Sequence, residues 1–471
     1  MISTGIASRP SVCVVKTGAS GFATSVCLYS NAQLNANIRF MPGDTVDEST
    51  SEKRPLVAVG YGPRCIPVMQ LAEAAAGLCE LLWLIDGSIP EMREMTELLH
   101  RFGPVVDIGG LGVDLILEEL SSPYRPAGIV TYLDANMSTL AHVAEALGLP
   151  FHSVATSIAL TDKTVQRQTL KEAGLSMPAS FAISPEQPEA SLVPIESQVG
   201  WPAVLKPRSA QGSRYTFFVK DERHLIGFLR ALGPTRPDMV LESYLADDPT
   251  RDGEPFAGYV SVESVVANRV ISHLALTGRF PLAENFRETG FFIPADLDDA
   301  DQVAVLALAT SAIEALGVTT GCLHTEIKFT PEGPRIIEVN GRVGGGVPEM
   351  LYRATGVALV EVTLRVALGE AVHVEGPVAT ERIGYRFFLQ PPPLSATVAA
   401  INGIDAVTDF PGVDTITLHQ SPGAVLDWKD GSRNHIMAVV GSAADYDELR
   451  AVDQLLNHEV TVTYANVSHD G

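Results

Sequence analysis

The chain has 471 residues, of which 46% are hydrophobic, and a formal net charge of −23. This length predicts about three domains, and the hydrophobic content excludes a largely disordered chain. The acidic balance, without a run of lysines or arginines, excludes nucleic acid and anionic membranes as partners. Five cysteines without a CxxC pair predict reduced thiols and a cytoplasmic location. No apolar stretch approaches the roughly 18 residues of a membrane span, and we expect no signal peptide.

Residues 1–54 predict an N-terminal extension. Strand patterns at 11–15 and 25–29 flank a turn-like segment, which favours a surface hairpin. The polar residues that follow read as a connection to the first domain.

Residues 55–150 alternate buried strand patterns with helices. This alternation predicts right-handed crossovers, a parallel sheet and a Rossmann-like domain. The turn Val59–Pro63 lacks the third glycine of a dinucleotide fingerprint, so it argues against a nicotinamide site. The expected strands are 55–60, 81–86, 104–109 and 127–132, and the expected helices are 65–80, 90–102, 113–121 and 137–147.

Residues 151–375 predict a larger domain with a smaller α+β unit inside it. The smaller unit, at about 175–245, lies between two hinges and is the expected lid. The expected helices of the domain are 161–173, 221–232, 299–316 and 348–369. The expected strands are 179–183, 202–207, 214–219 and 238–245, two within 258–280, and 322–329 and 334–340.

Gly376 and Pro377 mark the next boundary. Residues 376–471 carry short strand patterns with glycine and proline turns and one helix near 444–457. They predict a compact α+β C-terminal domain.

The most informative segment is a pair of strands with acidic and amide side chains, joined by a turn at Pro331–Gly333. Alternate residues of a strand face one side, so Glu326 on one strand converges with Glu338 and Asn340 on the other. Such hard oxygen ligands suit Mg²⁺ when a nucleotide supplies further oxygens. Arg342, two residues further, could hold a phosphoryl group. The alternative is an exposed face of charged pairs.

Three weaker segments point to a phosphorylated ligand. Lys206 ends a buried strand, and the small residues of the loop that follows would let backbone N–H groups approach phosphate oxygens, although a hairpin turn is the alternative. Lys163 starts a helix, where lysines are usually solvent-facing but anions also bind. The strand that ends at Glu242 could offer its backbone to an adenine edge at a hinge, and it is otherwise a plain strand end.

These segments, in this order, resemble the ATP-grasp superfamily and, within it, the carboxylate–amine ligases that include bacterial L-amino-acid ligases. The resemblance extends over about 55–470. It implies a multidomain α/β and α+β protein with an ATP-grasp fold, an N-terminal parallel α/β domain and a C-terminal α+β domain. The motifs that carry it are Thr161-Asp-Lys163, Leu205-Lys206-Pro207, Glu242–Leu245, His324-Thr-Glu326-Ile-Lys328 and Glu338-x-Asn340-x-Arg342.

The resemblance also implies roles for individual residues. Two Mg²⁺ ions, for which Mn²⁺ could substitute, would be bound by the metal ligands, and the catalytic residues would stabilise the acyl phosphate and lie near the metal. The implied ATP contacts are Lys163, Lys206, Ser209, Gly212, Ser213, Glu242, Ser243, Tyr244 and Leu245; the implied metal ligands are Glu326, Glu338 and Asn340; the implied catalytic residues are Arg342 and Glu288.

Three positions depart from the family pattern. Tyr259 stands where some relatives have an acidic ribose contact, and Phe291 replaces a polar residue that some relatives carry near the phosphates. The glycine run Gly344–Gly346 lacks bulky side chains that elsewhere narrow the pocket, which suggests a roomier or different carboxylate substrate.

The resemblance implies an ATP-dependent ligase that joins a carboxylate to an amine through an acyl phosphate and releases ADP and phosphate. Amino acids are the expected substrates, and a homodimer is the implied assembly. The alternatives are an ATP-grasp enzyme of the carboxylase or formyl-transfer type and a non-catalytic nucleotide sensor. The charges explain the residue types: phosphoryl transfer between two anions needs positioning and neutralisation more than covalent help from the protein.

Overall fold

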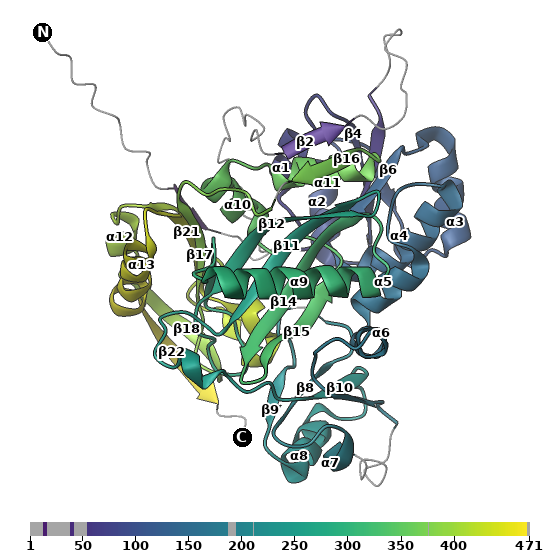
Figure 1. Cartoon of the computed structure of the whole chain (residues 1–471). Coiled ribbons are helices and arrows are strands. Elements are labelled where there is room, and N and C mark those ends of the chain that lie inside the picture. The colour runs from purple at the N-terminus through teal and green to yellow at the C-terminus, as the bar shows by residue number, and fades with distance from the viewer. Residues whose placement is uncertain are drawn as a thin grey trace, which may run out of the picture.

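The computed structural model describes residues 13–16, 38–41, 54–186, 195–210, 212–374 and 376–468. Its first domain is the parallel sheet that the sequence predicted, with the strand order β5-β4-β3-β6. Helices cover this sheet at the upper right of Figure 1. The strands are β3 (Leu56–Gly60), β4 (Glu80–Ile85), β5 (Val105–Asp107) and β6 (Gly128–Thr131), and the helices are α1 (Val68–Ala75), α2 (Pro90–Leu99), α3 (Val113–Glu119), η1 (Leu120–Tyr124) and α4 (Asp134–Leu147).

A nine-stranded sheet forms the centre of the molecule, in the order β1-β19-β21-β17-β13-β12-β11-β14-β15. It runs without a break from the central domain into the C-terminal domain, because β13 pairs with β12 on one side and with β17 on the other. Helix α9 crosses one face of it (Figure 1) and buries its apolar side there. The central elements are β11 (Tyr259–Ala267), β12 (Val270–Arg279), β13 (Gly290–Ile293), α9 (Asp299–Ala315), β14 (Gly321–Thr330) and β15 (Gly333–Asn340).

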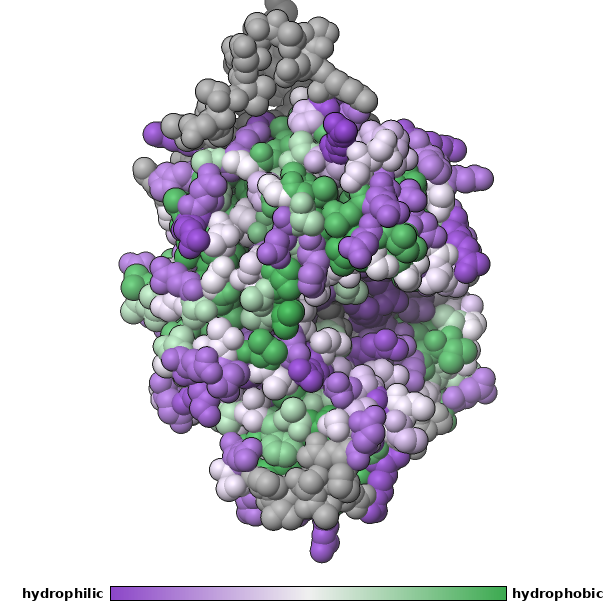
Figure 2. All heavy atoms as spheres, turned by 90° about the vertical axis from the view of Figure 1, so that its right-hand side faces the viewer, coloured by the Kyte–Doolittle hydropathy of each residue, from purple (hydrophilic) through white to green (hydrophobic). Residues whose placement is uncertain are grey.

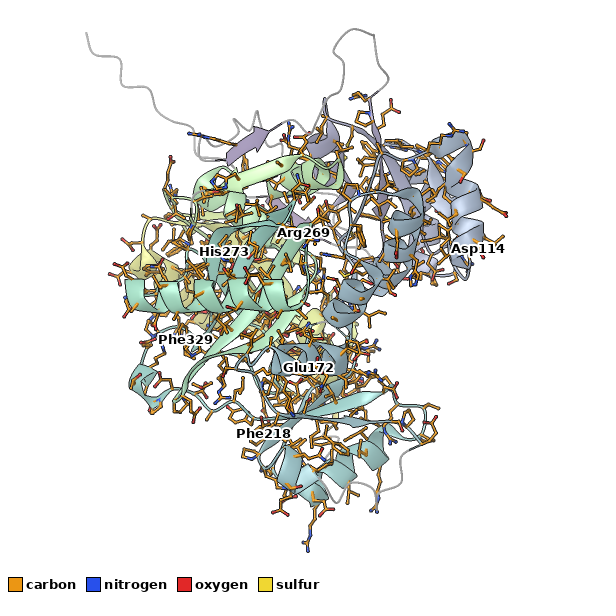
Figure 3. The ribbon with its side chains drawn as sticks, turned by 45° about the vertical axis from the view of Figure 1, so that its right-hand side comes forward. Asp114, Glu172, Phe218, Arg269, His273 and Phe329 are labelled. Atoms are coloured by element: carbon orange, nitrogen blue, oxygen red, sulfur yellow. The ribbon has the colours of Figure 1, made fainter. Side chains whose placement is uncertain are left out.

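The unit predicted to be the lid is a separate four-stranded antiparallel sheet in the order β7-β10-β8-β9, with its own apolar core. It lies at the bottom of Figure 1, and Figure 3 shows Phe218 on it and Glu172 at the junction above. Its elements are β7 (Ser180–Ile183), α7 (Ile195–Gln198), β8 (Ala203–Pro207), β9 (Phe217–Val219), α8 (Glu222–Leu232) and β10 (Met239–Ser243), and η3 (Pro249–Arg251) follows it.

The C-terminal part packs helices α12 and α13 on the extension of the large sheet and adds a three-stranded sheet, β20-β18-β22. Its elements are β17 (Ile383–Leu389), β18 (Ser395–Asn402), α12 (Ile404–Thr408), β19 (Val413–Leu418), β20 (Val425–Leu426), η4 (Trp428–Asn434), β21 (Met437–Ala443), α13 (Tyr446–Glu459) and β22 (Thr461–Ser468).

The N-terminal extension differs from the expected hairpin. The strand expected at 11–15 is present as β1 (Cys13–Lys16), but it pairs in parallel with β19, some 400 residues away along the chain. A further strand, β2 (Ile38–Met41), pairs with β16 (Ala371–Val374). The strand expected at 25–29 lies outside the described residues.

Two helix predictions also need correction. The single helix expected at 348–369 is two helices, α10 (Val347–Thr355) and α11 (Leu359–Ala367). Gly356 separates them because its φ of 76° is left-handed, a conformation that ends a helix and suits glycine. An additional helix, α5 (Val154–Thr161), precedes α6 (Lys163–Glu172). Within the described residues, no helix is long and apolar enough to cross a membrane.

Candidate active site

The start of α6 places Lys163 against the large sheet. Asp162 caps the helix by accepting hydrogen bonds from the backbone of Thr164 and Val165, and it also holds Arg208 with an N–O distance of 2.6 Å. Lys163 is buried, and its Nζ lies 2.8 Å from Glu338 Oε1. Lys163 is therefore an interior cation rather than the solvent-facing lysine that helix starts usually carry.

Lys206 is the second interior cation, and it shares a carboxylate with an arginine. Its Nζ lies 2.7 Å from Glu242 Oε2, while Arg167 Nε lies 2.9 Å from Glu242 Oε1. Burial and the neighbouring Arg167 lower the pKa of Lys206, although Glu242 opposes them. Burial would raise the pKa of Glu242, but Arg167 and Lys206 outweigh it and hold that pKa at about 2.

The backbone of the hinge after β10 is only partly free. The N–H of Ser243 donates to the carbonyl of Ala179 at 2.9 Å, and the N–H of Tyr244 donates to that of Pro202 at 3.1 Å. The backbone N–H of Leu245 has no such bond within the described residues. If an adenine edge is read here, Leu245 is the residue with a donor to offer.

The two acidic strands pair as the sequence predicted. Glu326 on β14 lies directly opposite Glu338 on β15, and His324 lies opposite Asn340. A register shift follows Glu326, because Ile327 pairs with Ile336 and leaves Ile337 as an extra residue on β15. Lys328 keeps the regular alternation of β14, and its Nζ lies 2.9 Å from Asp247.

Glu326, Glu338 and Asn340 together form what we call the acidic platform. A buried charge network contacts it at Glu326. His324 Nδ1 donates to Glu263 at 2.9 Å, and its Nε2 lies 3.4 Å from Glu326 Oε1. Burial would lower the pKa of His324, but Glu263 outweighs it and raises the pKa to about 9. The imidazole is therefore charged at neutral pH. Burial would raise the pKa of Glu326, but the hydrogen bond from His324 outweighs burial and lowers that pKa to about 2.

The platform fits a magnesium ion held jointly with a nucleotide. Within the described part of the chain, no three His, Cys, Asp or Glu side chains gather closely enough to hold an ion alone. Mg²⁺ usually takes one or two carboxylates and completes its shell with phosphate oxygens and water. Glu326 and Glu338 supply two carboxylates, and Asn340 adds an amide oxygen beside them.

Arg342 is fixed by the first domain. Its Nε donates to Asp134 Oδ1 at 2.9 Å, its Nη2 donates to Asp134 Oδ2 at 3.2 Å, and its Nη1 donates to the carbonyl of Val343 at 3.1 Å. Asp134 stands at the start of α4. The bidentate face of the guanidinium is thus already occupied, which leaves single N–H groups for a ligand.

Glu288 lies near the platform and beside a buried arginine. Arg279 Nε lies 3.7 Å from Glu288 Oε1. Burial raises the pKa of Glu288, with Arg279 opposing and Glu326 adding to the increase. The structure therefore brings Glu288, Glu326 and Arg279 into one electrostatic group.

The loop after β8 docks on the C-terminal domain. The N–H of Ser432 donates to the carbonyl of Gly212 at 3.0 Å, and the N–H of Tyr215 donates to that of Lys429 at 2.9 Å. Ser213 donates its hydroxyl to the carbonyl of Phe286 at 2.7 Å. Ser209 bonds instead to the carbonyl of Thr161. Hydrogen bonds thus hold the loop from two sides, at η4 in the C-terminal domain and at Thr161.

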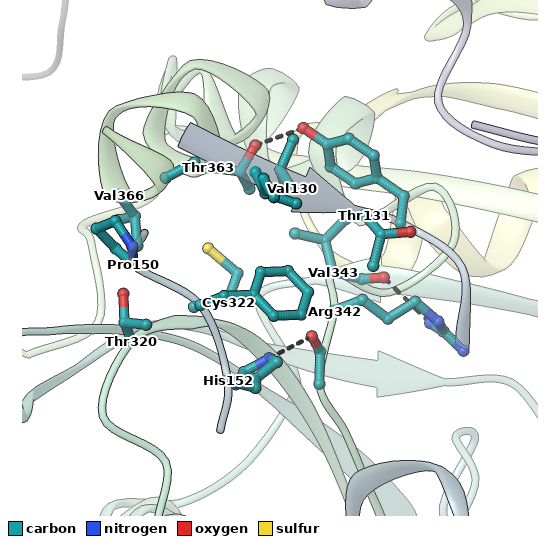
Figure 4. Close-up of a pocket in the computed structure, with 16 residues that line it drawn as sticks. Val130, Thr131, Pro150, His152, Thr320, Cys322, Arg342, Val343, Thr363 and Val366 are labelled. Carbon is teal, nitrogen blue, oxygen red and sulfur yellow. Dashed lines mark hydrogen bonds between the residues drawn. The ribbon is translucent and has the colours of Figure 1, made fainter. Parts of the chain in front are cut away.

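The described surface is hollowed beside the lid, and a separate cavity lies deeper. Figure 2 shows a recess at mid-height with hydrophilic side chains in it. The other cavity, of about 40 Å³, is lined by Arg342, Tyr132, Cys322 and Thr363 among others (Figure 4). It has room for a few water molecules and not for an amino acid. We therefore do not take it as the substrate site.

The three departures from the family pattern have local explanations. A Cβ on Gly344 would lie 2.5 Å from His324 Nδ1, so close packing requires glycine there. Phe291 is buried and packs against Phe388 with ring centroids 5.2 Å apart. Tyr259 is buried beneath the Arg279 guanidinium, which lies 5.7 Å from its ring centroid.

Sequence reasoning missed the residues that hold the expected site residues in place. Arg167 follows Lys163 by four residues and therefore lies one turn further along the same helix face. This spacing could have predicted that Arg167 lies near the site. Glu263, Arg279 and Asp134 gave no such signal, because their partners are far away in the sequence.

Comparisons with known proteins agree with this geometry. No family model matches the chain. An L-arginine-specific L-amino acid ligase of Bacillus subtilis is 22% identical over 319 residues, covering 64% of this chain and 72% of that protein. An uncharacterised protein of Sinorhizobium fredii, y4rH, is 25% identical over 354 residues, covering 71% of this chain and 69% of that protein.

Among solved structures, an L-amino acid ligase from Bacillus licheniformis superposes with a TM-score of 0.69 at 21% identity, covering 88% of this chain and 100% of that one. Other solved structures of this fold contain ATP or MgADP. In its fold, the order of its motifs and these relatives, the chain is similar to the carboxylate–amine ligases of the ATP-grasp superfamily.

Proposed function

We propose that this ATP-grasp ligase forms an amide, dipeptide-like bond between a small carboxylate and an amine, with amino acids as substrates. The carboxylate would be converted to an acyl phosphate at the expense of ATP, and the amine would displace the phosphate. The products would be the amide, ADP and phosphate. The observation that carries the proposal is that two lysines whose side chains are 6% and 12% exposed, an acidic platform and a fixed arginine converge from separate elements.

The proposed ATP contacts follow from where the cations lie. Lys163 and Lys206 would neutralise phosphate oxygens, and the loop with Ser209, Gly212 and Ser213 would cover them. The hinge Glu242–Leu245 would hold adenine, with Leu245 as the donor. Glu242 contributes by keeping Lys206 in place and charged.

The magnesium ligands in this proposal are Glu326, Glu338 and Asn340. Bound there, the ion would supply charge neutralisation between the nucleotide and the attacking carboxylate. His324 keeps Glu326 ionised and oriented, because it bridges that carboxylate and Glu263. The network thus prepares a platform of fixed shape.

Arg342, Glu288 and the lid would supply the other functions that the reaction needs: charge stabilisation, proton transfer and exclusion of water. Arg342 would stabilise the charge on the acyl phosphate through its free N–H groups, and Asp134 would hold it in place. Glu288, whose pKa is raised by burial, is placed to handle a proton near the platform. The docked lid loop would exclude water, which otherwise hydrolyses an acyl phosphate.

A matrix of carboxylates against amines, read by phosphate release, tests the proposal. Release that needs both partners and yields the condensed product supports ligation. Release with bicarbonate or formate alone would instead favour a carboxylase or formyl-transfer enzyme, and ATP binding without turnover on any pair would favour a sensor. A cytoplasmic location and a homodimer complete the proposal, and sedimentation of the full chain checks the second.

A further inference from the structure

The segment η4 of the C-terminal domain lies between the lid loop, which follows β8, and the segment before β13 that carries Glu288. Ser432 in η4 is buried and forms hydrogen bonds through its N–H, its hydroxyl and its carbonyl. Its N–H donates to the carbonyl of Gly212 on the lid loop at 3.0 Å. Its hydroxyl accepts from the N–H of Glu288 at 2.9 Å. A single residue thus connects the lid loop to a proposed catalytic residue.

The C-terminal domain holds both backbone groups of Glu288. Besides the bond from the Glu288 N–H to Ser432, Gln390 Nε2 donates to the Glu288 carbonyl at 2.6 Å. Gln390 Nε2 and His435 Nδ1 also donate to the carbonyl of Ser432, at 3.1 Å and 2.9 Å. The side chain of Glu288 is 28% exposed and lies 3.7 Å from Arg279. Because Ser432 and Gln390 fix this backbone, a shift of Ser432 would also shift the carboxylate that follows from it.

Further contacts join the lid to the start of η4. The N–H of Tyr215 donates to the carbonyl of Lys429 at 2.9 Å. The ring of Trp428 packs edge-on against Phe217 of β9, with ring centroids 5.8 Å apart, and so adds to the apolar core of the lid. The lid therefore contacts η4 through apolar packing as well as through hydrogen bonds.

Gly431 provides the bend that brings Ser432 to the lid loop. Its φ of 70° and ψ of −148° interrupt the helical conformation of η4. A Cβ on Gly431 would lie 2.2 Å from the carbonyl oxygen of Gly212 and 2.6 Å from the carbonyl carbon of Ser213. The lid loop thus fits against bare backbone directly before Ser432, which only glycine allows. The position of Ser432 therefore depends on how the lid loop is docked.

We propose that Ser432 is a positioning residue that couples docking of the lid to the placement of Glu288. With the lid docked, Ser432 holds Glu288 where it accepts a proton from the attacking amine. With the lid open, Ser432 loses its bond to Gly212, and the placement of Glu288 relaxes. The inference rests on the proposed function, since it adds a residue that acts on the same site through another.

This coupling bears on a competition between amine and water for the acyl phosphate. When an ammonium substrate reacts, the nitrogen–carbon bond forms, the bond from that carbon to the phosphate oxygen breaks, and the nitrogen loses two protons. One proton leaves on the phosphate, and the other passes to Glu288 and then to solvent. When water attacks instead, the carboxylate, phosphate and a proton are released and no amide forms. Placing Glu288 only when the lid is docked confines proton transfer to the state that excludes water.

The variant Ser432→Ala tests the coupling, because it removes the bond to Glu288 and keeps the backbone bond to the lid loop. Amide and phosphate are measured together in the full chain with ATP, Mg²⁺ and a carboxylate–amine pair that it condenses. We expect the amide formed per phosphate released to fall about fivefold, the effect of losing one neutral hydrogen bond. Ser432→Thr keeps a hydroxyl and should restore most of this ratio. An unchanged ratio in Ser432→Ala would overturn the inference.

The matched control is Ser421→Ala, the same change at an exposed position of the C-terminal domain, which should leave the ratio unchanged. A double-mutant cycle then distinguishes coupling from two independent effects. Gly431→Ala displaces the lid loop and should lower the same ratio. If Ser432 acts through the docked lid, the double variant should match Gly431→Ala within about twofold. Losses that multiply in the double variant would overturn the coupling.

Hydrogen exchange tests the coupling without turnover. Exchange of backbone amides in residues 212–219 and 284–292 is followed by mass spectrometry in the full chain, with a non-hydrolysable ATP analogue and Mg²⁺. We expect Gly431→Ala to lose protection in both segments and Ser432→Ala to lose it only in the second. Protection of the second segment that survives in Gly431→Ala would overturn the coupling. If exchange follows the expected pattern but no substrate pair yields an amide, the proposed function fails alone.

Discussion

Lys163 and Glu338 form an ion pair with an N–O distance of 2.8 Å, so a proposed phosphate ligand and a proposed magnesium ligand neutralise each other. Their side chains expose only 6% and 19% of their surface, and an unpaired charge at either position would be costly. Binding of a nucleotide together with a metal ion would replace this ion pair with two new contacts. Lys163 would contact a phosphate, and Glu338 would contact the metal ion. The charge balance of the site is therefore kept in both states.

Glu338→Gln is expected to abolish turnover and preserve the fold. The amide keeps the shape but removes the charge that would hold the metal, and we expect phosphate release to fall on the order of 100-fold. Phosphate release under saturating ATP and Mg²⁺ measures this. The matched control is Glu332→Gln, at the exposed turn of the same strand pair. Near-normal release by Glu338→Gln would show that the metal assignment is wrong.

Arg342→Ala is expected to lower kcat more than it weakens ATP binding. Its guanidinium is proposed to act on the acyl phosphate, and loss of one such group costs on the order of 100-fold in rate. Steady-state kinetics and ATP titration separate the two effects. Asp134→Asn should show a smaller loss of the same kind, because Arg342 stays but loses its charged partner. Equal losses in ATP affinity and rate would count against this role.

Glu242→Gln is expected to change how stability depends on pH. The folded-state pKa of Glu242, about 2, lies below the ordinary value of 4.5. The unfolded chain therefore takes up the proton first as the pH falls. Stability from this group is present above pH 4.5 and is lost progressively toward pH 2, by roughly 3 kcal/mol.

At pH 7 the variant should be less stable, because Arg167 and Lys206 lose the charge they share. Urea unfolding midpoints between pH 7 and pH 2.5 measure both effects. The gap between wild type and variant should narrow as the pH falls. Parallel curves would mean that Glu242 is not ionised in the folded protein.

Gly431→Ala is expected to loosen the docked lid loop. Gly431 has a φ of 70°, and a Cβ there would lie 2.2 Å from the carbonyl oxygen of Gly212. We expect a loss of turnover between about tenfold and 100-fold, since small misplacements of a site are costly. Gly423→Ala is the control, because its φ of 94° is equally unfavourable but no atom lies within 4 Å of its Cβ. If both variants lost activity equally, backbone strain rather than docking would be the cause.

The sequence by itself determined the parallel first domain, the fold family and the acidic strand pair. These depend on local patterns: the period of apolar residues sets the type of element, and alternation sets the face on which Glu326 and Glu338 lie. Local patterns could not show the register shift after Glu326 or the helix break at Gly356. Each depends on the backbone conformation at a single position, which the period of apolar residues does not indicate.

The tertiary structure alone decided which charges meet. Arg342 binds Asp134 across 208 residues, Arg167 binds Glu242 across 75, and β1 joins a strand near the other end of the chain. Such contacts form because packing of separate elements brings side chains within a few ångströms, and no spacing in the sequence encodes that distance. The physical reason is that periodicity describes an element, whereas a site is made where several elements meet.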